Sequence, residues 1–161
     1  MDNQQAIGTV VGLYLGEGHF SVSKWQRANG KWQFNAEIGF SNSDPALLDY
    51  ICDFLDSFPV GYHISQNANG CYQVKVQNQG HLVQLLDVLE PHLFGKKKAE
   101  AALLRRYIKS RDPRRGGRGS RLPNADRTYT EEDHAIADER RLLRESSETK
   151  SMTPYTRQAK I

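Results

Sequence analysis

Glu17 is the side chain whose surroundings point most directly to chemistry. It lies between Gly16 and Gly18 at the end of an apolar run, within the stretch GTVVGLYLGEGHFSV at residues 8–22. Gly12 and Gly16 are four residues apart, so on a helix they share one face. The missing side chains let a second helix approach that face closely. Packing two copies of this helix together would therefore bring two Glu17 carboxylates to one place.

Two adjacent carboxylates repel one another unless a cation lies between them. Oxygen ligands suit magnesium, and a metal beside a phosphodiester activates water and stabilises the leaving oxygen. Other glycine motifs fit poorly. The stretch lacks the Gly-Lys-Ser/Thr of a phosphate loop, its glycines follow a helical pattern rather than a strand, and its apolar run is too short for membrane helices. The stretch predicts a paired metal site for phosphodiester chemistry.

The elements that position this site follow from hydrophobic periodicity. Apolar residues at helical spacing predict a helix over 4–16, which the glycines end. Asn-Gly turns in RANG and NANG each join two strands of alternating polar and apolar residues. Ser43 is the candidate N-cap of the next helix, with Pro45 in its first turn. The other predicted elements are strands at 19–26, 31–42, 60–66 and 71–78, and helices at 43–58, 81–90 and 97–110.

The order αββαββα, with one trailing helix, predicts an α+β domain over residues 1–110 with helices on one side of an antiparallel sheet. The other face of the sheet is polar but barely charged. Antiparallel sheets often have one solvated face, yet amide side chains both donate and accept hydrogen bonds, which suits base edges in a major groove. The candidate DNA-binding residues on the strands are Ser21, Ser23, Trp25, Arg27, Gln33, Asn35, Glu37, Ser41, Gln66, Gln73, Lys75 and Gln77.

Charge is distributed unevenly along the chain. Residues 1–94 carry a net charge of −5, residues 95–127 carry +9, and residues 128–161 carry −1, although the whole chain carries only +3. Such a basic block indicates a polyanion partner such as nucleic acid, while a solvated linker is the simpler alternative. The candidate phosphate contacts in this block are Lys98, Arg114, Arg115 and Arg118.

Residues 111–161 are expected to extend the same domain. From Arg111 to Arg127, six arginines lie among glycines and prolines without apolar periodicity, which predicts a mobile basic loop. A short helix is expected after Thr130, followed by an extended or disordered tail from residue 147. Cys52 and Cys71 lack a paired spacing, which favours free thiols in a reducing compartment. We expect a soluble intracellular protein without a signal or transit peptide.

Three segments carry a family resemblance. VVGLYLGEG, residues 10–18, resembles the signature of the LAGLIDADG homing endonucleases, with Glu17 in the place of the catalytic acid. GFSNSDPALLDYI resembles the family's strand-to-helix junction, and LEPHLFGKKKAEAALL resembles the segment that supplies a basic residue. The resemblance runs from residue 5 to roughly residue 110 and implies active-site positions for Asn42, Asp44 and Lys96. Two departures are Val11 for the motif's first alanine and glutamate for its usual aspartate.

The single motif implies a homodimer with a twofold axis between the motif helices and with Gly8, Gly12 and Gly16 at the interface. By resemblance, each subunit lays its strands into the major groove of double-stranded DNA. The target is then long and nearly palindromic, because the protein is twofold symmetric. The resemblance also implies an intron-encoded, site-specific enzyme that leaves short 3′ overhangs.

The same resemblance implies the chemical roles. Glu17 and Gly16 would hold Mg2+ over the minor groove, with Mn2+ or Ca2+ as substitutes for binding. Lys96 would stabilise the charge that develops on the phosphate, and Asp44 or Asn42 would position water.

Two alternative functions stay open. Some relatives are RNA maturases that help their host intron to splice, and a transcription regulator could keep the fold without cleavage. The presence of Glu17 and Lys96 argues against such a loss. The histidines show no zinc spacing, and a phosphate contact by His19 is a minor alternative to a surface or core role. An organelle, either chloroplast or mitochondrion, and a prokaryotic cytoplasm are both compatible with the chain, and no membrane is expected.

Overall fold

The computed structural model describes residues 3–112 and 129–150, and its element order is the predicted one. The first unit comprises α1 (Asn3–Glu17), β1 (Gly18–Gln26), β2 (Trp32–Asn42) and α2 (Pro45–Ser57). The second comprises β3 (His63–Gln66), β4 (Tyr72–Val76) and α3 (Gln79–Leu89). The chain continues through η1 (Glu90–His92), α4 (Gly95–Arg111) and α5 (Glu131–Lys150).

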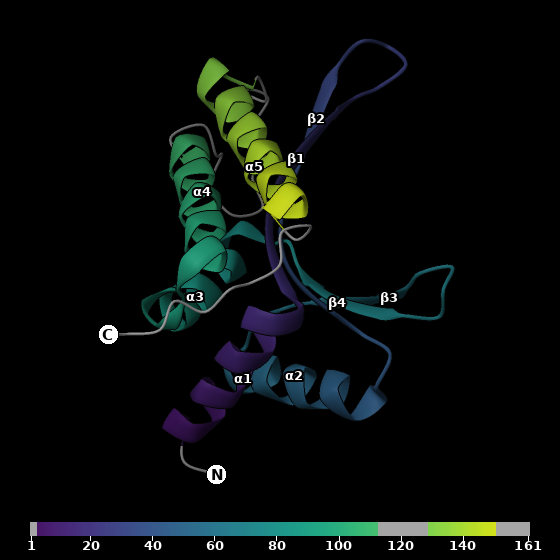
Figure 1. Cartoon of the computed structure of the whole chain (residues 1–161), viewed down its shortest axis with the longest axis vertical. Coiled ribbons are helices and arrows are strands. Elements are labelled where there is room, and N and C mark those ends of the chain that lie inside the picture. Colours follow the sequence, from purple (N-terminus) through teal and green to yellow (C-terminus); the bar gives the residue numbers. More distant parts are fainter. Residues whose placement is uncertain (1–2, 113–128, 151–161) are drawn as a thin grey trace.

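The four strands form one antiparallel sheet in the order β1-β2-β4-β3. The β1–β2 hairpin runs alongside α5, and the tips of the two hairpins project beyond the helices and diverge from each other (Figure 1). Each turn contains a glycine with a left-handed backbone, Gly30 at φ 78° and Gly70 at φ 79°, a conformation that side chains disfavour. Both predicted Asn-Gly hairpins are thereby confirmed.

The core lies between the sheet and the helices. Phe20, Ile38 and Phe40 are fully buried on the helix-facing side of β1 and β2. Tyr14 of α1 packs on them, with its ring centroid 5.9 Å from that of Phe40. Alternation along the strands therefore leaves the other face to polar side chains, as the period of two predicts.

The N-cap of α2 is Asp44, so the prediction of Ser43 is wrong by one residue. The Asp44 side chain accepts a hydrogen bond from the backbone nitrogen of Ala46 at 2.9 Å. The reason is that Pro45 occupies the first helical position, which its fixed φ and missing N–H suit, so the residue before it becomes the cap.

Helix α5 is longer and more deeply packed than the sequence indicates. It has 20 residues and includes residues 147–150, where the sequence predicts an extended or disordered tail. Thr130 is confirmed as its cap, because the Thr130 hydroxyl accepts from Asp133 N and Asp133 Oδ2 accepts from Thr130 N. Ile136 is fully buried in the common core. The basic loop predicted before α5 lies outside the described residues from position 113 to position 128.

Candidate functional site

Glu17 is exposed as the last residue of α1, and β1 begins at the next residue. Gly18 makes this abrupt transition possible, because a Cβ atom there would lie 2.5 Å from Tyr14 Cδ1. The carboxylate is thus held at the C-terminal end of a helix, where the partial negative charge favours cations nearby.

Lys97 supplies positive charge at this position. Its ammonium donates a hydrogen bond to the carbonyl oxygen of Gly18, immediately after Glu17. Burial lowers the pKa of Lys97, and the carboxylates of Glu100 and Glu17 oppose that shift. Sequence reasoning missed Lys97 because three consecutive lysines precede the periodic part of α4. Successive helical residues point about 100° apart, so the choice among them depends on the helix phase.

Lys96, the predicted basic residue, faces a different carboxylate. Its ammonium is 3.8 Å from Glu100 Oε1. Glu100 is buried and also lies 3.4 Å from the guanidinium of Arg140, a residue of α5. Arg140 in turn donates to the carbonyl oxygen of Phe20 on β1. An ionic network therefore supports α4 beside the α1–β1 junction, and the catalytic role of Lys96 stays a prediction.

Asn42 and Asp44 lie at the end of β2, next to the start of β1, since Gly18 pairs with Phe40 in the sheet. Asn42 Oδ1 accepts from the backbone nitrogen of Asp44 at 2.8 Å. Both side chains therefore shape the β2–α2 turn. The structure brings them to the same end of the sheet as Glu17, and their proposed role with water stays a prediction.

One face of α1 has no close neighbour among residues 3–112 and 129–150. Gly8, Gly12 and Gly16 are exposed, and a Cβ atom added at any of them would meet no heavy atom within 4 Å. This face ends at Glu17. A second helix could thus approach α1 on this side without a clash with the described residues.

Most of the predicted DNA-binding residues lie on the sheet face opposite the helices. Gln66 is an exception, because it pairs with Tyr72 and therefore shares a face with Val74 and Val76 of the core side. Ser23, Trp25, Arg27, Gln66 and Gln77 are exposed. A second group, Ser21, Gln33, Asn35, Ser41, Gln73 and Lys75, is half-buried, and Glu37 is buried. Lys98 is exposed on α4, whereas Arg114, Arg115 and Arg118 lie outside the described residues.

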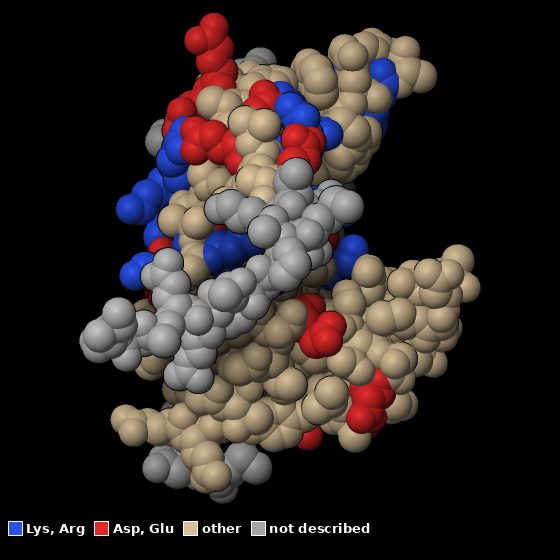
Figure 2. All heavy atoms as spheres, in the orientation of Figure 1, with Lys and Arg blue, Asp and Glu red and all other residues tan. Residues whose placement is uncertain are grey.

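The β3–β4 hairpin is polar but almost without formal charge. Between Asp56 and Asp87 the chain has a single Lys, Arg, Asp or Glu, which is Lys75. In Figure 2 this hairpin projects as an uncharged arm, while charged side chains gather over the helices and the β1–β2 tip. Amides and hydroxyls on such an arm suit hydrogen bonds to bases better than ionic contacts to phosphates.

Glu37 forms the centre of a cluster that we call the Glu37 cluster, with His19, Asn35, Lys75 and Gln77. Its Oε1 atom lies 3.0 Å from His19 Nε2 and 3.5 Å from Lys75 Nζ. Its Oε2 atom accepts from Asn35 Nδ2 at 2.7 Å and from Gln77 Nε2 at 2.9 Å. The His19 contact, with the two amides and the Lys75 charge, lowers the pKa of Glu37 to about 2 against the effect of burial.

Gly39 leaves room for this cluster. It pairs with His19 on β1 and with Lys75 on β4. A Cβ atom on Gly39 would lie 2.2 Å from His19 Cε1, so the imidazole occupies the space that a side chain would take. The sequence offers no simple signal for this, because the cluster depends on the register of three strands.

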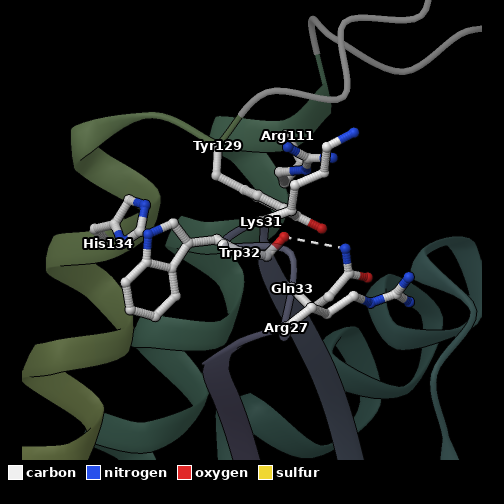
Figure 3. Close-up of a pocket in the computed structure, with 8 residues that line it drawn as sticks. Arg27, Lys31, Trp32, Gln33, Arg111, Tyr129 and His134 are labelled. Atoms are coloured by element: carbon white, nitrogen blue, oxygen red, sulfur yellow. Dashed lines mark hydrogen bonds between the residues drawn. The ribbon is translucent and has the colours of Figure 1, made fainter.

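A pocket of about 900 Å³ lies at the tip of the β1–β2 hairpin, beside α4 and α5 (Figure 3). The Trp32 ring points toward His134, with ring centroids 5.1 Å apart, and the Arg111 guanidinium lies 4.7 Å over the Tyr129 ring. The lining also includes Arg27, Lys31 and Gln33. Cations and aromatic rings at the far end of the sheet provide a surface suited to a polyanion.

Two further properties concern the described part of the chain. No group of three or more His, Cys, Asp or Glu side chains that could hold a metal ion occurs within residues 3–112 and 129–150. Within the same ranges, none of the helices is both long and apolar enough to cross a membrane.

Comparisons with known proteins concern the family and the fold. A model of the LAGLIDADG endonuclease family matches residues 10–107. The homing endonuclease I-CvuI in complex with its target shares 20% sequence identity and a TM-score of 0.66, over 87% of this chain and 82% of that one. The homing endonuclease I-TnaI shares 20% identity and a TM-score of 0.61, over 89% and 96% of the two chains.

An archaeal intron-encoded homing endonuclease complexed with DNA shares 18% identity and a TM-score of 0.58, over 88% of this chain and 99% of that one. At these identities the likeness to the solved structures concerns the fold. No curated protein matches this chain in sequence.

Proposed function

Because this chain belongs to the LAGLIDADG endonuclease family, we propose that it is a homing endonuclease that binds double-stranded DNA through its sheet and cleaves both strands. The position of Glu17 carries the proposal. It is exposed at the junction of α1 and β1, between the open glycine face of the helix and the polar face of the sheet. The DNA complexes of I-CvuI and of the archaeal enzyme support DNA as the ligand of this fold.

We propose that the active form is a homodimer. The open face at Gly8, Gly12 and Gly16 supports this, since small residues four apart let two helices approach closely. Each subunit would then present one sheet to one half of the target, which makes the target long and nearly palindromic. Two cutting sites across the minor groove act on staggered phosphates, and so we expect short 3′ overhangs.

A divalent cation fits the donors at the end of α1. The Glu17 carboxylate and the Gly16 carbonyl are oxygen donors of the kind that Mg2+ prefers. Each copy contributes the Glu17 carboxylate, so we place the ion between the Glu17 residues of two copies. When bound, the ion supplies activation of water and stabilisation of the leaving oxygen. I-CvuI complexes were solved in the presence of calcium and of magnesium, which supports divalent ions in this fold.

The residues of this chain would hold and polarise the cleaved phosphate. Lys97 lies next to Glu17, and Lys96 lies one position away on α4, so both can provide positive charge for the developing phosphate charge. Asn42 and Asp44 lie at the adjacent end of β2, where we propose that they orient the attacking water.

Cleavage of a plasmid library that carries randomised inserts, in the presence of magnesium, tests the function. We expect the wild type to cut a subset of inserts and Glu17→Gln to bind those inserts while cutting at least about a hundredfold more slowly. Glu131→Gln removes an exposed carboxylate from the start of α5 and should cut like the wild type. Cutting by Glu17→Gln at a near wild-type rate would remove Glu17 from the mechanism. Binding without cutting by the wild type would instead favour a regulator.

A further inference from the structure

Glu37 lies in the centre of the sheet face that we assign to DNA, yet it is only 7% exposed. Both of its carboxylate oxygens already meet side-chain nitrogens of the Glu37 cluster. It therefore has no acceptor to offer to a base. A carboxylate on this surface also repels phosphates, so direct contact with DNA does not account for its presence.

The cluster fixes the orientation of two amides. An ionised carboxylate only accepts hydrogen bonds, so any amide group that contacts it must present its nitrogen. Asn35 Nδ2 and Gln77 Nε2 both do so toward Glu37 Oε2. The same Gln77 nitrogen donates to Asn35 Oδ1 at 3.2 Å. The amide hydrogens of Gln77 and the amide oxygen of Asn35 are thus both occupied within the cluster.

Gln77 Oε1 is the acceptor that this arrangement leaves available. Gln77 is exposed, and no described residue donates a hydrogen bond to its amide oxygen. In the major groove, adenine and cytosine present exocyclic amino groups, whereas guanine and thymine present oxygen acceptors at the corresponding edge. An amide oxygen that cannot exchange places with its nitrogen accepts a hydrogen bond from adenine or cytosine and is repelled by the oxygen of guanine or thymine.

Resting on the proposed function, we propose that Glu37 is a specificity-determining positioning residue. It holds Gln77 so that Oε1 reads an amino-bearing base, adenine or cytosine, in each half of the target. Loss of the carboxylate frees the amide to rotate, and Gln77 then meets a donor or an acceptor equally well.

A purely structural role for Glu37 makes a different prediction. The cluster joins β1, β2 and β4, because His19, Asn35 and Lys75 come from these three strands. If Glu37 only joined strands, its loss would weaken binding to all targets alike. If Glu37 orients Gln77, its loss removes the preference of the protein at one base pair in each half-site and leaves the preferences at the other base pairs unchanged.

Selection from a randomised duplex library separates the two roles. The full chain carries Glu17→Gln in every arm, so that bound DNA stays intact. We expect a strong preference for adenine or cytosine at one position of each half-site, of about tenfold or more. Addition of Glu37→Gln should reduce this preference to about threefold or less, with the other positions unchanged.

A double-mutant cycle connects the effect to Gln77. Gln77→Ala leaves the His19 and Lys75 contacts of Glu37 in place and should reduce the preference at the same base pair. This variant tests the proposal even if a thermal unfolding assay shows that Glu37→Gln folds poorly. In the Gln77→Ala background, Glu37→Gln should have no further effect on specificity. Gln73→Ala removes an amide of β4 outside the cluster and should relax a different position.

The outcomes are distinct. The positioning role would be overturned if Glu37→Gln left the base preferences unchanged. It would also be overturned if Glu37→Gln reduced specificity in the Gln77→Ala background as much as it does alone. Neither result would contradict the proposed endonuclease function. Enrichment of no sequence by the Glu17→Gln parent would overturn the proposed function, and the positioning role with it.

Discussion

At the scale of single residues, the site depends on how charges are neutralised. Glu17 lies at a helix C-terminus, which disfavours an anion by about 0.3–1 kcal/mol in exposed settings. The ammonium of Lys97 at the adjacent Gly18 carbonyl offsets this effect. On the proposed function, we expect the same ammonium to act on the phosphate that approaches Glu17.

Substitution of the three lysines of α4 tests this assignment. Lys97→Met should slow single-turnover cleavage by at least about tenfold with a smaller effect on DNA affinity, because it removes charge beside the reacting phosphate. Lys96→Met tests the role implied by the family resemblance. Lys98→Met removes an exposed ammonium and should mainly weaken binding. A slower rate for Lys98→Met than for the other two would show that the helix phase assigned to the site is incorrect.

Glu37 also makes stability depend on pH. Its pKa falls from the ordinary 4.5 to about 2, so its stabilisation is complete above about pH 4.5 and is lost as the pH falls toward 2. The shift corresponds to about 3 kcal/mol at most. We expect the difference in free energy of unfolding between wild type and Glu37→Gln to shrink by about 2 kcal/mol between about pH 6 and about pH 3. Urea unfolding at a fixed protein concentration measures it, and a constant difference would contradict the assignment.

At the scale of elements, α1 combines two surfaces. Val10 and Tyr14 pack into the core, while a Cβ atom on any of the glycines on the other side would meet no atom of the described residues within 4 Å. A large side chain on the glycine face should consequently disturb assembly and leave the fold of the subunit intact.

Gly12→Leu should convert the dimer into a monomer that keeps its helical circular dichroism, since leucine favours a helix over glycine by about 1 kcal/mol. Analytical ultracentrifugation measures the mass. Ala102→Leu places the same side chain at an exposed position of α4 and should stay dimeric. A dimeric and fully active Gly12→Leu would show that the subunits do not meet through this face.

Elements were more predictable than their contacts. The αββαββα order and both hairpins follow from local periodicity and Asn-Gly turns, and the structure confirms them. The packing of α5 does not follow from local periodicity, because the contact of Arg140 with the Phe20 carbonyl joins residues 120 positions apart. The contact of Lys97 with Gly18 and the burial of Glu37 depend on helix phase and strand register in the same way. The glycine spacing and the family resemblance both point to Glu17, whereas its neighbours in space required coordinates.

At the scale of the whole molecule, charge is separated along the chain from the hairpin that we propose contacts bases. The β3–β4 hairpin carries almost no formal charge, whereas residues 95–127 carry a net charge of +9. Phosphate contacts set affinity and its salt dependence but carry no sequence information. Affinity and specificity should accordingly respond to different substitutions.

Replacement of Arg114, Arg115 and Arg118 by Gln should flatten the salt dependence of DNA affinity, by about one unit of log–log slope for each lost phosphate contact. Base preferences should stay unchanged. Arg105 is already paired with Asp87 and Glu90, so Arg105→Gln should leave the slope as it is. Titrations across a salt series on selected and scrambled duplexes measure both effects. An unchanged slope in the triple variant would make the segment a passive linker.

The direct passage from α1 to β1 has a mechanical consequence. Glu17 ends the helix, Gly18 begins the strand, and the Gly18 carbonyl is held by Lys97. Helix and strand are thus joined without an intervening loop. On the proposed function, β1 contacts the bases and Glu17 the scissile phosphate, so we expect poor seating of β1 on a wrong sequence to move Glu17 away from that phosphate. Mismatched DNA would then be cut more slowly through misalignment as well as through weaker binding.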